Sequence, residues 1–161
     1  MTDIREYLAR KPLLFDGGMG TYYKAAPGAD CEMANLTDPE GVKKVHAEYL
    51  AAGAQAIKTN TFGLPRMAAA QMPGWEELAE AGWKLACDAA AEKGAAVFAD
   101  LGPALDTEAA PASSAYGLVA QQFAALGAKN FLFETLSSDV GIVEAVKALR
   151  VAVPDAFVID R

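Results

Sequence analysis

Residues 54–63 of the chain, AQAIKTNTFG, decide the fold because they join a short apolar run to a polar turn. The run from Ala54 to Thr59 has the length of a buried strand, and Asn60-Thr61-Phe62-Gly63 follows it. Upstream, a helical pattern begins at Thr37-Asp38-Pro39-Glu40, which offers a cap and a proline suited to the first turn, and ends at Gly53, which suits the left-handed conformation. Downstream, residues 75–93 show helical spacing again. A strand with a helix on each side is the unit of a parallel sheet.

The same unit recurs along the 161 residues. The predicted strands are residues 13–15, 54–59, 95–99, 130–133 and 156–159, and the predicted helices are residues 37–52, 66–72, 75–93, 116–126 and a helix capped by Ser137 and Ser138 that runs through Arg150. Residues 22–37 read as a loop. The order βαβαβαβαβ with continuous apolar strands predicts an α/β fold with a parallel sheet. An open doubly wound sheet and part of a TIM-type (β/α)8 barrel both fit, and a full barrel takes about 250 residues.

Composition excludes several classes of protein. The net charge is −7, and the lysines and arginines are interleaved with acids rather than gathered in a basic patch, so nucleic acid is not an expected partner. No segment reaches the roughly 18 apolar residues that span a membrane, and the start lacks the pattern of a signal peptide. Cys31 and Cys87 form no CxxC pattern, which favours a reduced, cytoplasmic protein.

Polar residues follow the predicted strands at their carboxyl ends. They are Asp16, Thr59-Asn60-Thr61, Asp100 and Glu134-Thr135. In parallel α/β folds the carboxyl ends of the strands meet at one edge, where ligand sites are built. We therefore expect these side chains to share one site.

Each local motif has a functional and a purely structural interpretation. The turn Gly17–Gly20 fits a phosphate cradle or a tight strand-to-loop turn, although its spacing is not GxGxxG and no Lys or Arg lies next to it. The Thr59–Thr61 segment offers groups to a small polar ligand, or caps the next helix. Glu134 could bind a ligand ammonium, or form a salt bridge. His46 reads as a structural helical histidine and Cys87 as a packing residue.

Taken together, the segments at these strand ends resemble the homocysteine S-methyltransferase domains. The segments that carry the resemblance are LFDGGMGT at 14–21, EMANLT at 32–37, VHAEYLAAGA at 45–54, TNTFG at 59–63, DLGP at 100–103 and FET at 133–135. The TNTF element is most similar to the cobalamin-dependent methionine synthase type. The resemblance implies a TIM barrel that binds homocysteine and zinc, with methyl-cobalamin as a methyl donor. It implies that Asp16 and Gly17 meet the substrate amino group, that Glu134 pairs with the ammonium, and that Thr59, Asn60 and Thr61 line the pocket.

One departure from the family pattern matters for function. The family's zinc ligands are a cysteine after the sixth strand and a Cys-Cys pair in a Gly-Gly-Cys-Cys-Gly segment after the eighth, and this chain has neither segment. We therefore expect residues 1–161 to be the N-terminal half of the barrel, without catalytic or metal-binding residues of its own, and inactive in methyl transfer when alone. The expected partners are homocysteine and either a C-terminal half-barrel or a second copy of the chain. The alternative is a non-catalytic half-barrel that acts as a binding or assembly module.

Overall fold

A computed structural model describes residues 3–24, 30–104, 111–139 and 141–161, and these contain a four-stranded parallel sheet. The strands are β1 (Ala56–Lys58), β2 (Ala96–Leu101), β3 (Asn130–Phe133) and β4 (Phe157–Asp160). They lie in the order β1-β2-β3-β4, so each strand pairs with the next one along the chain. A doubly wound sheet reverses its strand order at a switch point, and this sheet contains no such reversal.

The prediction of a strand at residues 13–15 is wrong. This segment pairs with β1 only through an isolated bridge between Phe15 and Ala56, and the Asp16 N–H donates to the Ala56 carbonyl at 3.0 Å. Leu14 is 57% exposed, so the segment lacks the two-sided burial that a central parallel strand has. The described residues thus have four strands rather than the five of the predicted βαβαβαβαβ order.

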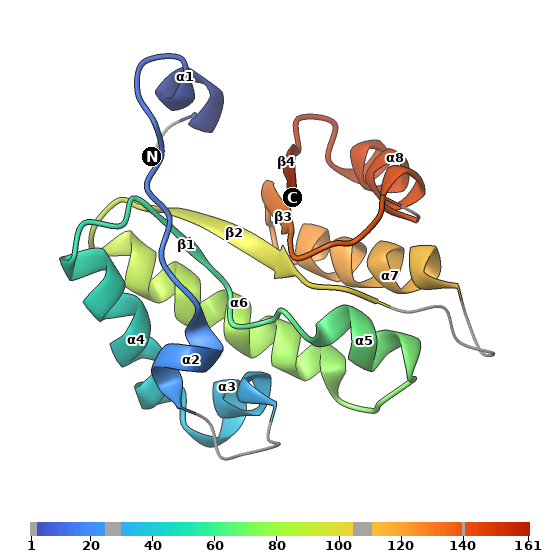
Figure 1. Cartoon of the computed structure of the whole chain (residues 1–161), viewed down its shortest axis with the longest axis horizontal. Coiled ribbons are helices and arrows are strands. Elements are labelled where there is room, and N and C mark those ends of the chain that lie inside the picture. The colour runs from blue at the N-terminus through green and yellow to red at the C-terminus, as the bar shows by residue number, and fades with distance from the viewer. Residues whose placement is uncertain (1–2, 25–29, 105–110, 140) are drawn as a thin grey trace.

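The helices of the described residues are α1 (Ile4–Leu8), α2 (Met19–Tyr23), η1 (Cys31–Met33), α3 (Ala34–Thr37), α4 (Pro39–Ala51), α5 (Leu64–Ala69), α6 (Trp75–Ala91), α7 (Ala112–Ala125) and α8 (Ile142–Ala152). The longer helices cover one face of the sheet. Figure 1 shows α4, α6, α7 and α8 following one another along that face. The start of α4 is as predicted, since Asp38 Oδ1 accepts from the Gly41 N–H at 3.1 Å and Pro39 opens the helix.

Several predicted boundaries are wrong, including that of the helix predicted at 66–72, which is α5 at Leu64–Ala69. The predicted loop at 22–37 contains the end of α2, η1 and α3 in its described part, whereas Pro27 and Gly28 lie outside the described residues. Helix α7 begins at Ala112 rather than near Tyr116. Helix α8 begins only at Ile142, after Gly141 with φ +83°, and no side chain caps its start, so the predicted cap by Ser137 or Ser138 is wrong.

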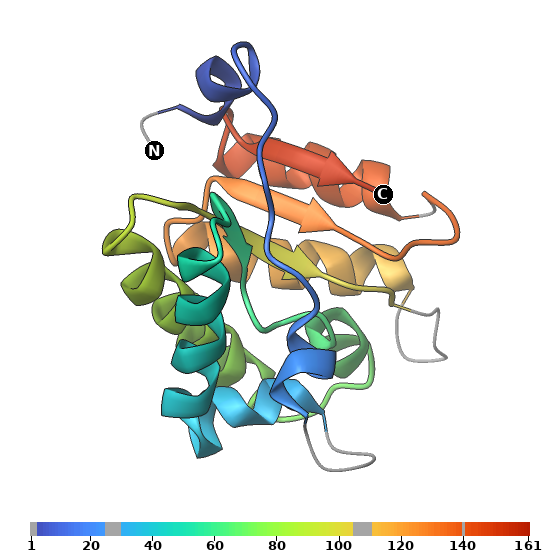
Figure 2. The same cartoon turned by 60° about the vertical axis from the view of Figure 1, so that its left-hand side comes forward.

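The opposite face of the sheet carries a smaller apolar cluster. Its buried members are Ile4, Ala56, Ala96, Phe98 and Leu132. Figure 2 shows the N-terminal stretch and α1 on this side of the sheet. Helix α1 is attached there by Arg5, whose Nη2 donates to the Ala156 carbonyl at 3.0 Å and whose guanidinium lies 5.3 Å from the ring centroid of Phe157. We refer to this face as the inner face.

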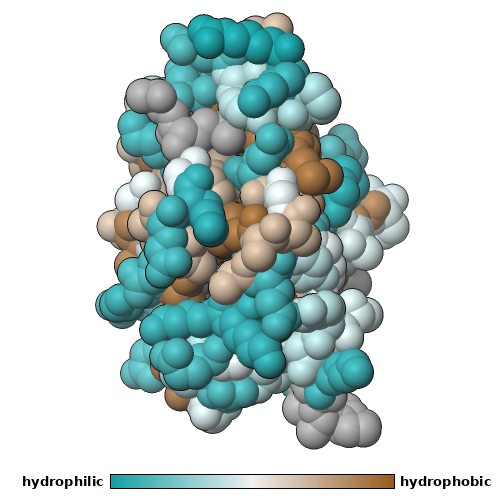
Figure 3. All heavy atoms as spheres, turned by 90° about the vertical axis from the view of Figure 1, so that its left-hand side faces the viewer, coloured by the Kyte–Doolittle hydropathy of each residue, from teal (hydrophilic) through white to brown (hydrophobic). Residues whose placement is uncertain are grey.

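Figure 3 shows the side of the molecule on which α4 lies. This surface is mainly hydrophilic, with a smaller hydrophobic area near the middle of the view. Two exposed ion pairs lie on this helix, Glu40 with Lys43 and Lys44 with Glu48. Within the described ranges, no helix combines the length and the apolar character that crossing a bilayer requires.

Candidate functional site at the carboxyl edge of the sheet

The alternation of side chains along each strand brings three charged residues to one place. Lys58, Asp100 and Glu134 each lie two positions after an inner-face apolar residue, namely Ala56, Phe98 and Leu132. Residues two apart on a strand point to the same face. Because β1, β2 and β3 are adjacent and parallel, the three charged side chains meet above the apolar cluster, at the carboxyl edge.

A cavity of about 300 Å³ opens at this edge. It is lined by Asp16, Gly17, Gly18, Met19, Gly20, Thr21, Cys31, Glu32, Lys58, Thr59, Asn60, Thr61, Phe62, Asp100 and Glu134. All six predicted substrate-binding residues are among them, although they come from three separate parts of the sequence. Of the strand-end residues that were expected to share one site, all except Thr135 line this cavity.

Glu134 is held between two cations. Lys58 Nζ lies 3.2 Å from its Oε1 and 3.4 Å from its Oε2, and Arg161 Nη2 donates to Oε2 at 2.6 Å. Burial by itself would raise the pKa of Glu134, but the hydrogen bond from Arg161 and the charge of Lys58 outweigh burial and lower this pKa below its ordinary value. Glu134 is therefore an ionised carboxylate.

Two further carboxyl groups in the cavity have an oxygen without a partner. Asp16 Oδ2 accepts from the Lys58 backbone N–H at 3.1 Å, but Asp16 Oδ1 and Asp100 Oδ1 are buried and accept no hydrogen bond from the described residues. Burial is the main reason that the pKa of Asp16 rises to about 6. Burial, followed by repulsion from Glu134, also raises the pKa of Asp100 well above its ordinary value. Both groups can therefore accept a hydrogen bond from a ligand, and a positively charged ligand would favour their ionised forms.

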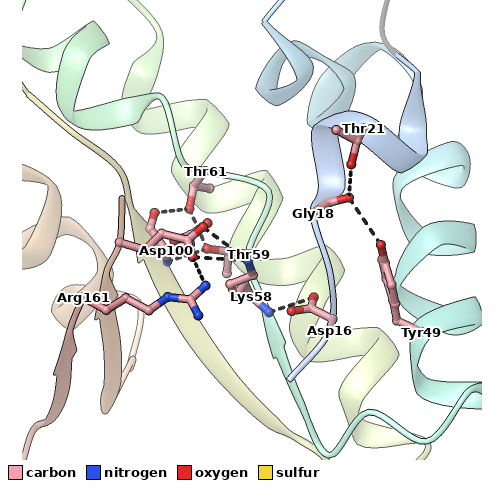
Figure 4. A network of polar contacts seen from close by, with 10 residues as sticks. Asp16, Gly18, Thr21, Tyr49, Lys58, Thr59, Thr61, Asp100 and Arg161 are labelled. Atoms are coloured by element: carbon pink, nitrogen blue, oxygen red, sulfur yellow. Dashed lines mark hydrogen bonds and ion pairs between the residues drawn. The ribbon is translucent and has the colours of Figure 1, made fainter. Parts of the chain in front are cut away.

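Thr59 and Thr61 use their hydroxyls to fix β2 rather than to face the cavity. Their Oγ1 atoms lie 2.5 Å apart, Thr61 Oγ1 donates to the Asp100 carbonyl at 2.9 Å, and Thr59 Oγ1 accepts from the Asp100 N–H at 3.0 Å. Both residues are almost fully buried. Figure 4 shows the two hydroxyls beside Asp100. Their contacts in the structure are positioning contacts that hold Asp100 at the cavity.

Asn60 is similarly engaged within the protein. Its Nδ2 donates to the Cys31 carbonyl at 2.8 Å and to Asn35 Oδ1 at 2.9 Å, and its Oδ1 accepts from Cys31 Sγ at 3.2 Å. This amide therefore ties the turn after β1 to the segment that contains η1 and α3.

The glycine turn is shaped by Tyr49 of α4. A Cβ on Gly17 would lie 2.6 Å from the Tyr49 hydroxyl oxygen, so no other residue fits here without a shift. The Gly18 carbonyl accepts from Tyr49 Oη at 3.4 Å and from Thr21 Oγ1 at 3.3 Å, as Figure 4 shows. The glycines thus let the backbone pass close to α4 at the wall of the cavity.

Sequence reasoning missed Lys58, Glu32, Asn35 and Arg161, and it placed Asp100 at the edge without naming it as a ligand residue. The signal for Lys58 was present, because it is a charged side chain within a short apolar strand. Glu32 is buried, and its Oε1 accepts from the Gly63 N–H at 2.5 Å, a contact that joins residues 31 apart. Nothing local in the sequence indicates such a pairing.

The zinc ion that the resemblance implies does not fit the residues present. In the described ranges, no group of three or more His, Cys, Asp or Glu side chains could hold a metal ion. Cys31 lines the cavity, where burial and the neighbouring charge of Glu32 raise its pKa to about 12 and keep it a thiol when no metal is bound, and one cysteine does not supply the several ligands of a zinc site. Cys87 lies on α6 and does not line this cavity.

A parallel α/β sheet in sequential order, with a carboxylate-rich cavity at its carboxyl edge, defines a class of ligand-binding α/β domains. The sequence model of the family "Homocysteine S-methyltransferase" matches residues 13–158, and the chain belongs to this family. It is 36% identical over 72 residues to methionine synthase of Mycobacterium tuberculosis and 35% identical over 72 residues to that of Mycobacterium leprae. Each match covers 38% of this chain and 6% of the relative.

Solved structures share the fold. The homocysteine methyltransferase MmuM from Escherichia coli superposes with a TM-score of 0.72 in its metallated form, at 21% identity over 96% of this chain. Its apo form gives a TM-score of 0.68 at 25% identity, again over 96% of this chain. The chain spans 64% of the metallated structure and 61% of the apo structure, so it is shorter than the relatives it matches.

Proposed function

We propose that the chain is the homocysteine-binding part of an S-methyltransferase and that its cavity receives the amino-acid end of homocysteine. The observation that carries this proposal is that Asp16, Gly17, Thr59, Asn60, Thr61 and Glu134 all line one cavity. Membership of the family supports homocysteine as the ligand.

The charges in the cavity suit an ammonium group. Glu134 supplies an ionised carboxylate, and Asp16 supplies a buried oxygen that has no partner in the part of the chain that the structure describes. Gly17 lets the backbone come close to the ligand, whereas Thr59, Asn60 and Thr61 hold the walls. An ammonium that reaches two carboxyl groups gains charge-assisted hydrogen bonds, which are stronger than neutral ones. The proposed roles are therefore ligand contact for Asp16, Gly17 and Glu134, and positioning for the other three residues.

Isothermal titration of the purified protein tests this assignment. L-homocysteine should bind, and 4-mercaptobutanoate, which lacks only the amino group, should bind at least tenfold more weakly. Glu134→Gln and Asp16→Asn should each remove most of that difference, whereas Asp155→Asn, at an exposed ion pair outside the cavity, should leave it unchanged. Equal affinity for the two ligands would contradict the proposed roles of Asp16 and Glu134.

We further propose that residues 1–161 correspond to the N-terminal half of a (β/α)8 barrel and do not transfer methyl groups alone. The sequential strand order and the 61–64% coverage of the solved relatives support this correspondence. Zinc supplies a thiolate nucleophile where it is bound, and the ligand set for it is not found among the described residues. The methyl donor, with methyl-cobalamin as the first candidate, would come with another domain or chain. Stoichiometric zinc together with methionine formation by the purified chain would contradict the proposed inactivity.

The alternative, a non-catalytic assembly module, rests on the inner face. Leu13, Phe15, Phe157 and Ile159 pack on its cluster but are only partly buried, and β4 pairs with β3 alone among the described strands. An open strand edge beside apolar side chains favours association with a second half-barrel or a second copy. Light scattering at micromolar concentration, with and without a separately expressed C-terminal half, tests this. A stable monomer that does not associate with the C-terminal half would exclude the alternative.

A further inference from the structure

The ion pair between Lys58 and Glu134 places an ammonium group where the proposed ligand's ammonium would go. The two side chains are only 11% and 10% exposed, and Lys58 Nζ approaches both Glu134 oxygens. From this geometry we infer that Lys58 is an internal occupant of the ammonium site, and that an amino-acid ligand binds by displacing Lys58 from Glu134. This inference rests on the proposed function and goes beyond it by naming a residue that sets affinity.

The chemistry of the two groups is the same. A lysine side chain ends in a primary ammonium with three N–H donors, and the α-ammonium of an amino acid also has three. Lys58 is tethered to β1, and among the described hydrogen bonds its Nζ donates only to Glu134. Asp16 Oδ1 and Asp100 Oδ1 in the same cavity have no hydrogen-bond partner among the described residues. A free ligand ammonium has enough donors for all three carboxyl groups, so the site offers it acceptors that Lys58 leaves unused.

Displacement does not leave Glu134 without a cation, since Arg161 Nη2 remains on its Oε2 at 2.6 Å. Removing one partner of a buried ion pair is costly mainly because it strands the other charge. The Arg161 contact reduces that cost at Glu134. Lys58 itself can move outward, because a flexible four-carbon stem carries its charge.

An internal competitor weakens the observed affinity. When only a fraction of molecules has Lys58 displaced, the apparent dissociation constant equals the intrinsic one divided by that fraction. Removing the ammonium while keeping the stem should therefore tighten ligand binding. Lys58→Met keeps an unbranched apolar side chain and has no charge, so it is the appropriate variant. Lys84→Met is the matched control, because Lys84 lies on α6 in an exposed ion pair with Asp88 and does not line the cavity.

The first experiment is titration of L-homocysteine into the purified protein, Lys58→Met and Lys84→Met. We expect Lys58→Met to bind at least tenfold more tightly than the unaltered protein, and Lys84→Met to bind as the unaltered protein does. The gain should vanish for 4-mercaptobutanoate, which brings no ammonium. Weaker or unchanged homocysteine binding by Lys58→Met, in a protein that does bind homocysteine, would overturn the inference.

The second experiment needs no homocysteine. Lys58→Ala removes the stem and the charge, and ethylammonium ions should then raise its melting temperature by several degrees, with no such rise in the unaltered protein. Tetramethylammonium, which has no N–H donor, should not do so at equal ionic strength, and Lys58→Ala combined with Glu134→Gln should not respond to ethylammonium. If ethylammonium rescues Lys58→Ala while homocysteine binds no variant, the proposed function fails and the internal ammonium site stands. If ethylammonium has no effect, the inference fails whatever homocysteine does.

Discussion

Asn35 and Asn60 hold each other by two hydrogen bonds across 25 residues of sequence. Asn60 Nδ2 donates to Asn35 Oδ1 at 2.9 Å, and Asn35 Nδ2 donates to the Asn60 carbonyl at 2.8 Å. Asn35 Nδ2 also donates to the Leu78 carbonyl of α6 at 3.2 Å, and Asn35 is 2% exposed. The turn after β1 is thus joined to α3 and α6 by one buried side chain.

Asn35→Ala should lower the free energy of unfolding by about 2–3 kcal/mol, because it leaves the Asn60 and Leu78 carbonyls without their donor in a buried place. Urea unfolding followed by circular dichroism measures this change. Thr37→Ala is the control, since its exposed hydroxyl donates to the Met33 carbonyl and its loss should cost less than about 0.5 kcal/mol. Equal losses for the two variants would show that Asn35 does not join these segments.

Gly82→Ala should be destabilising although alanine favours helices. A Cβ at Gly82 in α6 would lie 2.7 Å from Asn35 Nδ2 and 2.8 Å from Thr61 Cγ2, so the helix and the turn after β1 would have to separate. We expect a loss of about 1–3 kcal/mol, as for other overpacked sites. A Cβ at Gly117 in α7 meets none of the described residues within 4 Å, so Gly117→Ala should instead stabilise by about 0.5–1 kcal/mol. Chemical denaturation of both variants should give opposite signs, and a stabilised Gly82→Ala would refute the close approach.

Acid should destabilise the protein through His46. This histidine is fully buried, both its ring nitrogens lack partners among the described residues, and burial lowers its pKa from 6.5 to about 4. Between about pH 6.5 and pH 4 the histidine is protonated in the unfolded chain but neutral in the folded chain. The free energy of unfolding therefore falls as pH drops through this range. The full effect is about 3 kcal/mol for a shift of this size. His46→Leu should remove this slope in urea titrations between pH 7 and pH 4.5, and an unchanged slope would contradict the prediction.

Asp16 should have the opposite effect. Burial raises its pKa from 3.8 to about 6, so the folded state binds its proton more tightly than the unfolded chain does. The stability that this proton contributes is lost as pH rises through 6. Asp16→Asn should therefore raise stability at pH 7.5 by about 1–3 kcal/mol while weakening the binding of an ammonium ligand. Unfolding curves at pH 4 and pH 7.5 test the first part, because the gain should be present only at the higher pH. A gain of equal size at both pH values would exclude ionisation of Asp16 as its cause.

Local signals were sufficient for most of the framework. Asp38 with Pro39 predicted where α4 begins, and Gly53, with φ +107°, ends it in the left-handed conformation as expected. The apolar run before Glu134 matched β3 at residues 130–133. These features depend on neighbours in sequence, which is why periodicity and capping residues reveal them.

Contacts between distant residues were not predictable in this way. Residues 13–15 have the composition of a strand, but among the described residues they form one bridge, between Phe15 and Ala56. The polar turn at 59–61 was correctly placed at the cavity, yet its hydroxyls bond to the backbone of Asp100, 41 and 39 residues away. Whether a polar side chain contacts a ligand or forms hydrogen bonds within the protein depends on partners that are distant in sequence, which local sequence does not reveal.

The alternation of side chains along β2 places one residue in the apolar cluster of the inner face and another at the cavity. Phe98 and Asp100 are two residues apart on this strand, with Phe98 in the cluster and Asp100 lining the cavity. A single inserted residue between them would send Asp100 among the helices while Phe98 stayed in place, whereas a two-residue insertion would preserve the direction of both. The two-residue alternation of side chains along this strand therefore limits which insertions the family can accept near the ligand site without repacking its interior.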